Sequence, residues 1–313
     1  MPISTDNQLT LPDGRRLGYA SYGPDNGWPV LFFHGIPGSR HSSHSAGLVG
    51  QTHNARLIAF DRPGYGLSDS LKGRQIHDWP EDVEAALDVL GIDRFSLFGY
   101  SGGGPFALAT AVAMPKRVAS LTNVSAMGPL DTPEAEARLS HRQQFERFVC
   151  ARITPILRFK TWQAAQSIRA DVGDYLASRA RAAPEEDRLQ IERPAINAVM
   201  RQDLLASVER GGGTLAHELS LMARSWEFDL TKVRAPMQLW HGTADDIVPL
   251  WVAESVAKRL PHAKTRYLSG LGHLLLLSHM NDIIEQLLDT RSEAPSPAEP
   301  SSPAEPAAAA GAD

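Results

Sequence analysis

The sequence has almost no cysteine and no concentration of positive charge. Among 313 residues, Cys150 is the single cysteine, which excludes an intramolecular disulfide framework and any metal site built from several cysteines. Lys and Arg number 31 against 36 Asp and Glu, and the charges are interspersed without a basic block. We therefore expect no nucleic-acid partner.

Long hydrophobic runs are also missing. The longest apolar stretch, residues 274–277, is far shorter than the ~20 residues that a membrane span requires. The first residues lack the basic and then apolar pattern of a secretory signal. These features predict a cytoplasmic protein with no membrane partner.

The end of the sequence has little that can form a core. From Ser292 it consists mainly of Pro, Ala, Ser and Glu, and the pentapeptide Ser-Pro-Ala-Glu-Pro occurs at 296–300 and again at 302–306. Such a composition buries too little surface to offset the entropy of ordering. We predict that residues 291–313 form a disordered tail outside the fold.

Short apolar runs alternate with helix-like stretches in the remainder. Runs at 30–33, 57–60, 95–98 and 118–124 are separated by segments such as 79–90, whose apolar residues have helical spacing. This alternation predicts βα units and a mostly parallel sheet flanked by helices. Further apolar runs follow at 237–240 and 264–268.

Between these two groups of runs the sequence is helical in character. Helix breaks are expected at Pro155, Pro184, Pro194 and residues 211–213. We interpret residues 130–230 as a helical cap over the carboxyl ends of the strands. The α/β core then comprises residues 1–129 and 231–290.

A G-x-S-x-G pentapeptide, Gly99-Tyr100-Ser101-Gly102-Gly103, lies between a predicted strand and a predicted helix. A strand that turns directly into a helix forces its apex residue into a strained backbone conformation, and flanking glycines remove colliding β-carbons. The apex hydroxyl then projects from the sheet, and the Gly102 amide lies at a helix N-terminus.

The same region fits a dinucleotide fingerprint, G-x-G-x-x-A, at residues 102–107. That motif needs an acidic residue at the end of the next strand, but the first one available is Asp131. Two βα units also precede this loop, whereas the fingerprint opens its sheet. We therefore predict no dinucleotide and no other cofactor.

Four further motifs resemble those of the α/β-hydrolase fold family. They are His-Gly-Ile-Pro-Gly at 34–38, Asp-Arg-Pro-Gly-Tyr-Gly-Leu-Ser-Asp at 61–69, Gly-Thr-Ala-Asp-Asp-Ile-Val-Pro at 242–249 and Gly-Leu-Gly-His at 270–273. The resemblance covers residues 9–290 in the family's order. It implies an α/β-hydrolase fold with an inserted helical cap.

The resemblance also implies roles for individual residues. Ser101 would be the nucleophile, His273 the general base, and Asp245 the carboxylate that orients the imidazole. The backbone amides of Ile36 and Gly102 would form the oxyanion hole.

Other residues remain as alternatives. Asp246 and Asp131 are alternative candidates for the acid in place of Asp245. His34 is expected to brace the oxyanion loop. His41 and His44 have helix-face spacing for a metal, but no third ligand is evident, so we predict no metal site.

The expected reaction is hydrolysis of a small carboxylic ester or lactone through an acyl-enzyme on Ser101. Tyr100, Arg224, Trp226 and Phe228 are candidate substrate-pocket residues. Other reactions on this fold remain open: C–C bond hydrolysis, a lyase reaction, cofactor-free oxygenation, or ligand binding by a receptor without turnover. The expected partner is a small-molecule substrate, and the oligomeric state is left open.

Overall fold

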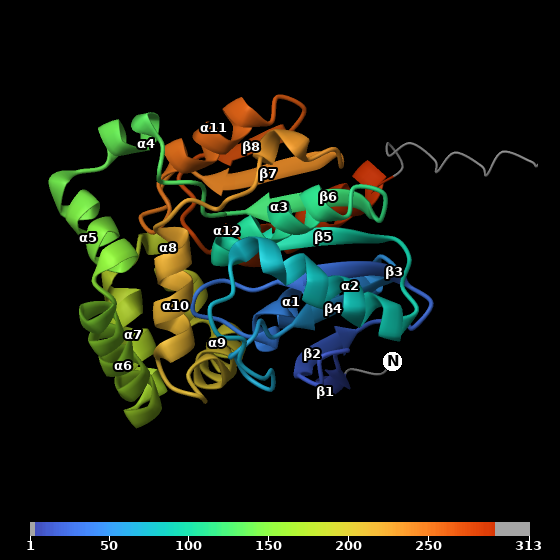
Figure 1. Ribbon diagram of the computed structural model, residues 1–313, viewed down its shortest axis with the longest axis horizontal. Helices are drawn as coiled ribbons and strands as arrows, with labels where there is room; N and C mark the ends of the chain where they lie inside the picture. Colours follow the sequence, from blue (N-terminus) through green and yellow to red (C-terminus); the bar gives the residue numbers. More distant parts are fainter. Residues whose placement is uncertain (1–3, 292–313) are drawn as a thin grey trace, which may run out of the picture.

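A computed structural model describes residues 4–291 and contains an eight-stranded sheet with helices on both faces (Figure 1). The predicted tail lies outside the described residues, except for Arg291. The strands are β1 (Ser4–Thr10), β2 (Arg16–Tyr22), β3 (Trp28–Phe33), β4 (Ala55–Phe60), β5 (Phe95–Tyr100), β6 (Val118–Val124), β7 (Met237–Gly242) and β8 (Lys264–Leu268). Their spatial order is β1-β2-β4-β3-β5-β6-β7-β8.

The six strands predicted from apolar runs are parallel to one another. β3 pairs with β4 and β5, and β6, β7 and β8 follow in the same direction. The sequence did not reveal β1 and β2, which are antiparallel and lie at one edge, where β1 is polar and mostly exposed. Because parallel strands end at the same edge of a sheet, the segments after β3, β5, β7 and β8 can meet there.

Apolar layers cover both faces of the sheet. The flanking helices are α1 (His44–Thr52), α2 (Trp79–Leu90), α3 (Gly104–Ala113), α11 (Leu250–Arg259) and α12 (Leu275–Thr290). Leu31 and Phe33 pack with residues of α2, α3 and α11, whereas Val30 and Phe32 pack with residues of α1 and α12. Neighbouring residues of a strand point to opposite faces, so burial of both faces explains the continuous apolar run of β3.

Seven helices occupy the segment between β6 and β7 and gather at one end of the sheet (Figure 1). They are α4 (Pro133–Arg138), α5 (His141–Arg152), α6 (Thr154–Ala170), α7 (Val172–Ala182), α8 (Glu185–Glu192), α9 (Pro194–Ser207) and α10 (Gly213–Met222). Pro155 and Pro194 lie in the first turns of α6 and α9, where a backbone N–H has no helical partner to lose. In residues 4–291, no helix is long and apolar enough to cross a membrane.

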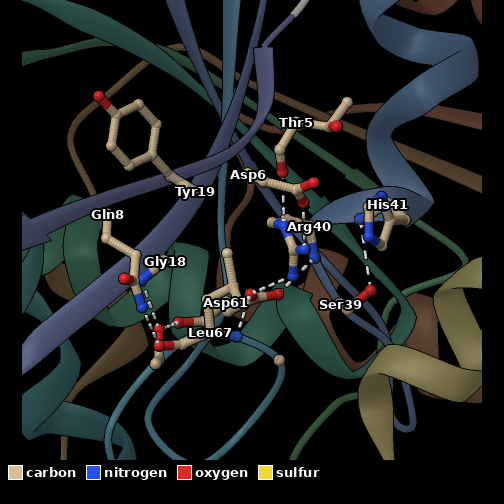
Figure 2. Close-up of polar contacts among 12 residues, drawn as sticks. Thr5, Asp6, Gln8, Gly18, Tyr19, Ser39, Arg40, His41, Asp61 and Leu67 are labelled. Carbon is tan, nitrogen blue, oxygen red and sulfur yellow. Dashed lines mark hydrogen bonds and ion pairs between the residues drawn. The ribbon is translucent and has the colours of Figure 1, made fainter. Parts of the chain in front are cut away.

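The carboxylate of Asp61, just after β4, holds several segments together (Figure 2). Its Oδ1 accepts from the Arg40 backbone N–H at 2.7 Å, and its Oδ2 accepts from Arg40 Nη1 at 2.8 Å and from the Leu67 N–H at 3.0 Å. A β-carbon on Gly66 would lie 2.3 Å from Asp61 Oδ2, and Gly66 has a φ of 42°. This explains why the 61–69 motif needs a carboxylate and a glycine at these positions.

Candidate active site

Ser101 lies at the bend between β5 and α3. Its φ is 50°, in the left-handed region that a residue with a β-carbon rarely adopts. A β-carbon on Gly99 would lie 2.3 Å from Asn123 Oδ1, and one on Gly103 would lie 2.0 Å from the Phe33 carbonyl oxygen. These approaches are too short for any β-carbon, so glycine is required at positions 99 and 103 for the chain to turn here.

The bend brings Ser101 to two side chains that follow other strands. His273 Nε2 lies 3.0 Å from Ser101 Oγ, and His273 Nδ1 lies 2.8 Å from Asp245 Oδ2. An ionised carboxylate only accepts hydrogen bonds, so Nδ1–H donates to Asp245 and Nε2 is free to accept from the Ser101 hydroxyl. Asp245 Oδ1 accepts from the N–H groups of Ile247 and Val248 at 3.0 and 2.8 Å, which fixes the carboxylate.

The two alternative acids lie apart from this chain of contacts. The side chains of Asp246 and Asp131 are exposed, and within residues 4–291 neither forms a hydrogen bond to His273. The carboxylate that bonds to the imidazole is therefore that of Asp245.

The loop after β3 runs beside the bend. A β-carbon on Gly102 would lie 2.5 Å from Ile36 Cγ1 and Cδ1, and one on Gly35 would lie 3.4 Å from Ser101 Cβ. Ile36 and Ser101 line the same cavity. The residues predicted to supply the two oxyanion amides, Ile36 and Gly102, are thus brought together next to the hydroxyl.

A buried ion-pair network contacts this loop through Arg62. Arg62 Nη1 donates to the His34 carbonyl oxygen at 2.6 Å, and Nη2 donates to that of Gly35 at 3.0 Å. Arg62 also pairs with both carboxylate oxygens of Glu218 on α10 at 2.7 Å, and Arg74 pairs with Glu218 at 2.6 Å. Burial raises the pKa of Glu218, but attraction to the two arginines outweighs burial and holds that pKa below its ordinary value.

His34 is packed into the same region. Its side chain is fully buried, and the Arg62 backbone N–H donates to His34 Nε2 at 3.3 Å. His34 Nδ1 lies 2.9 Å from the Gly35 carbonyl oxygen. Burial and the nearby Arg62 charge lower the pKa of His34 well below its usual value, which keeps the ring neutral. These contacts fit the expectation that His34 braces the loop.

Sequence reasoning missed Asp187, a buried residue of α8. Its Oδ2 accepts from the His273 backbone N–H at 2.8 Å, and its Oδ1 accepts from the Leu274 N–H at 2.9 Å. A β-carbon on Gly272 would lie 2.5 Å from the Asp187 carboxylate, so the glycine before His273 makes room for it. Burial raises the pKa of Asp187, while the two amide hydrogen bonds act in the opposite direction.

A cavity of about 370 Å³ opens beside Ser101 and His273. Tyr100 lines it as predicted, with its ring centroid 5.5 Å from that of His273. Most of the remaining wall is apolar, and α7, α8 and α9 contribute seven of its apolar residues: Leu176, Ala182, Ile191, Ile196, Val199, Met200 and Leu204. The cavity therefore suits a substrate with an apolar portion next to the hydroxyl.

Four charged residues interrupt the apolar wall: Arg179, Asp187, Asp203 and Asp246. Asp203 on α9 lines the cavity, and its Oδ1 accepts from the backbone N–H and the hydroxyl of Ser39, both at 2.7 Å. Burial raises the pKa of Asp203 to about 7. Asp203 therefore links the helical segment to the end of the loop that carries Ile36.

Three predicted pocket residues, Arg224, Trp226 and Phe228, do not line this cavity. Trp226 is buried in the core on the α2/α3 face and stacks on Phe228 with ring centroids 5.9 Å apart. Arg224 is exposed, donates from Nε to the Ala151 carbonyl oxygen at 3.1 Å, and lines a different cavity. All three residues follow α10, whereas the wall beside Ser101 is built by earlier helices of the segment.

Comparisons with known proteins agree with this architecture. A family model for the alpha/beta hydrolase fold matches residues 29–280. The chain is 29% identical to a non-heme chloroperoxidase from Streptomyces lividans and 24% identical to a bifunctional esterase/perhydrolase from Acinetobacter calcoaceticus. Each of these alignments covers 90% of this chain and 97% of the relative. An esterase from Exiguobacterium antarcticum has a similar fold, with a TM-score of 0.70 at 18% identity, covering 92% of this chain and 100% of the esterase.

Because Glu218 pairs with both Arg62 and Arg74, we predict that Glu218→Gln lowers the stability of the protein strongly. The substitution leaves two buried guanidinium groups without their counter-charge, so we expect the free energy of unfolding to fall by about 3 kcal/mol or more, measured by chemical denaturation. Glu146→Gln is the matched control, because it breaks an exposed pair with Arg142 and should cost less than about 1 kcal/mol. Equal losses in the two variants would contradict a structural role for the network.

Proposed function

Because the chain belongs to the alpha/beta hydrolase family, we propose that it is a serine hydrolase that cleaves a carboxylic ester or lactone through an acyl-enzyme on Ser101. The observation that carries the proposal is the continuous contact from Ser101 Oγ through His273 to Asp245 at 3.0 and 2.8 Å. A serine hydroxyl is a poor nucleophile unless a base accepts its proton, and this arrangement supplies one. The proposed reaction requires no cofactor.

In the proposed reaction, Ser101 Oγ attacks the carbonyl carbon while its proton passes to His273 Nε2. The amides of Ile36 and Gly102 stabilise the negative oxygen of the tetrahedral intermediate. The C–O bond to the alcohol then breaks, and the alcohol takes the proton from His273. A water molecule that His273 deprotonates attacks the acyl carbon, releases the acid and restores Ser101.

The proposal treats residues 130–230 as a cap that determines specificity. The apolar side chains that α7, α8 and α9 contribute to the cavity support this assignment. They favour an acyl or alcohol group of apolar character, with a small molecule as the only partner that the reaction requires.

The first test is Ser101→Ala with p-nitrophenyl butyrate as substrate. We expect kcat to fall on the order of 10⁶-fold, because the nucleophile and its base act as a unit. A fluorophosphonate should label the wild type at Ser101 and leave the variant unlabelled. Ser178→Ala, an exposed change on α7, is the control and should retain full activity and labelling. Residual turnover within tenfold of the wild type in Ser101→Ala would overturn the proposal.

The relatives favour one additional reaction of the same acyl-enzyme. One is named a non-heme chloroperoxidase and another a bifunctional esterase/perhydrolase. If hydrogen peroxide attacks the acyl carbon in place of water, the product is a peracid. We expect the wild type, given acetate and hydrogen peroxide, to form peracetic acid that brominates an added dye in the presence of bromide. Absence of peracid from an enzyme that hydrolyses esters would exclude this second reaction and leave the first intact.

Asp187 is the proposed positioning residue for His273. In Asp187→Asn, the amide oxygen can accept from one of the two backbone N–H groups, but the NH₂ group would face the other, also a donor. An unsatisfied buried donor costs about 1–3 kcal/mol, so we expect kcat to fall roughly 10- to 100-fold with KM little changed. Asp174→Asn, an exposed carboxylate of α7, is the control. An unchanged kcat, or a loss explained by a smaller folded fraction at the assay temperature, would contradict the positioning role.

A further inference from the structure

A second cavity, of about 480 Å³, shares no lining residue with the one beside Ser101. Its walls are the segment after β4 that contains residues 70–74, the beginning of α6, and α10. None of the residues assigned to the proposed reaction lines it, so an inference about this cavity does not depend on that reaction.

Positive side chains gather around this cavity, although Arg74 is paired with Glu218 and Arg210 with Asp69. Its lining includes five cationic side chains and no Asp or Glu, although the whole chain has a net charge of −5. The cations are Lys72, Arg74, Arg158, Arg210 and Arg224. Within residues 4–291, the side chains of Lys72 and Arg158 have no hydrogen-bond or ion-pair partner, and Arg224 donates only to a backbone carbonyl. Hydroxyl groups of Ser70, Thr154, Thr214 and Ser220 lie in the same lining.

The cavity wall also contains a buried donor without a partner. Arg74 is 3% exposed, and its Nη2 donates to Glu218 at 2.6 Å, but its Nη1 has no hydrogen-bond partner. Protein atoms cover this nitrogen, so Arg74 contributes positive charge to the cavity wall and no accessible donor.

The helix α10 begins at the same cavity. Gly213, its first residue, lines the wall, and no side chain caps this helix end. A β-carbon on Gly213 would meet nothing within 4 Å, so the side of the helix is open at this residue. Uncapped amides at a helix N-terminus carry partial positive charge and attract anions.

We propose that this cavity is a binding site for a small organic phosphate. Arginine forks match the geometry of phosphate oxygens, and a phosphate group near neutral pH carries close to two negative charges for several donors to share. In this proposal Arg158 and Arg224 bind the phosphate oxygens directly, while the charge of Arg74 and the first amides of α10 add electrostatic attraction.

The test is calorimetric titration of the full chain with inorganic pyrophosphate at a fixed ionic strength near 0.15 M. We expect saturable binding to one site, weakened at least tenfold in the double variant Arg158→Ala/Arg224→Ala. The double variant Arg181→Ala/Arg266→Ala removes the same charge from exposed arginines that do not line the cavity, and it should bind as the wild type does. Thermal melting of all three proteins verifies that each is folded.

Four outcomes would overturn the proposal, three with pyrophosphate and one with citrate. The wild type fails to bind millimolar pyrophosphate, or the first double variant binds it unchanged, or both double variants are weakened equally, which would indicate nonspecific attraction to surface charge. Citrate, which carries similar charge on carboxylates, distinguishes the ligand class. Binding of citrate as tight as that of pyrophosphate would show that the site does not prefer phosphate.

Discussion

The bend at Ser101 leaves no room for a β-carbon on Gly99 or Gly103, and the contact of the Ser101 hydroxyl with His273 depends on this bend. Gly103 lies against the backbone of β3, and Gly99 lies against Asn123 of β6. The two neighbouring strands therefore enclose the turn, and the left-handed φ of Ser101 is imposed by its surroundings. A hydroxyl held in this way does not need to be ordered again when a substrate arrives.

Buried charged side chains fix the conformation of the loops around the bend. The segment after β3 has few apolar side chains with which to pack, and its buried carbonyl groups would be costly without hydrogen-bond donors. Arg62 satisfies two of these carbonyl groups, while Glu218 balances the charge of Arg62. Asp61, the residue before Arg62, holds Arg40 and Leu67 in an equivalent way. The conformation of the loops is thus determined by a few ionic contacts.

The sequence predicted the features that local constraints determine. A buried parallel strand needs a continuous apolar run, and a strand-to-helix turn needs glycines at fixed spacing, so the positions of β5 and Ser101 could be read directly. The edge strand β1 has no apolar run because one edge and much of its surface meet solvent. The motif after β7 indicated a carboxylate but could not distinguish Asp245 from Asp246 by chemistry alone; the distance to His273 does so.

The parts of the site that the sequence did not reveal come from the helical segment. Asp187 lies 86 positions before His273 in the chain, in a helix whose sequence has no local pattern that marks a contact with a distant amide. The assignment of Arg224 and Trp226 to the pocket was wrong for a related reason. Both residues lie near the return to the sheet, and their position along the chain does not tell which helix faces Ser101. Tertiary packing of amphipathic helices decides such contacts.

Asp187 also limits how freely the helical segment can be exchanged among relatives. The helices α7, α8 and α9 shape the cavity, and α8 supplies the acceptor for the amides of His273 and Leu274. A chimera that receives a foreign segment to obtain a new pocket would lose that acceptor unless the donor carries one in the same place. Pocket shape and support for the imidazole are therefore inherited together, and recombination that separates them would give well-folded proteins with a poorly anchored histidine.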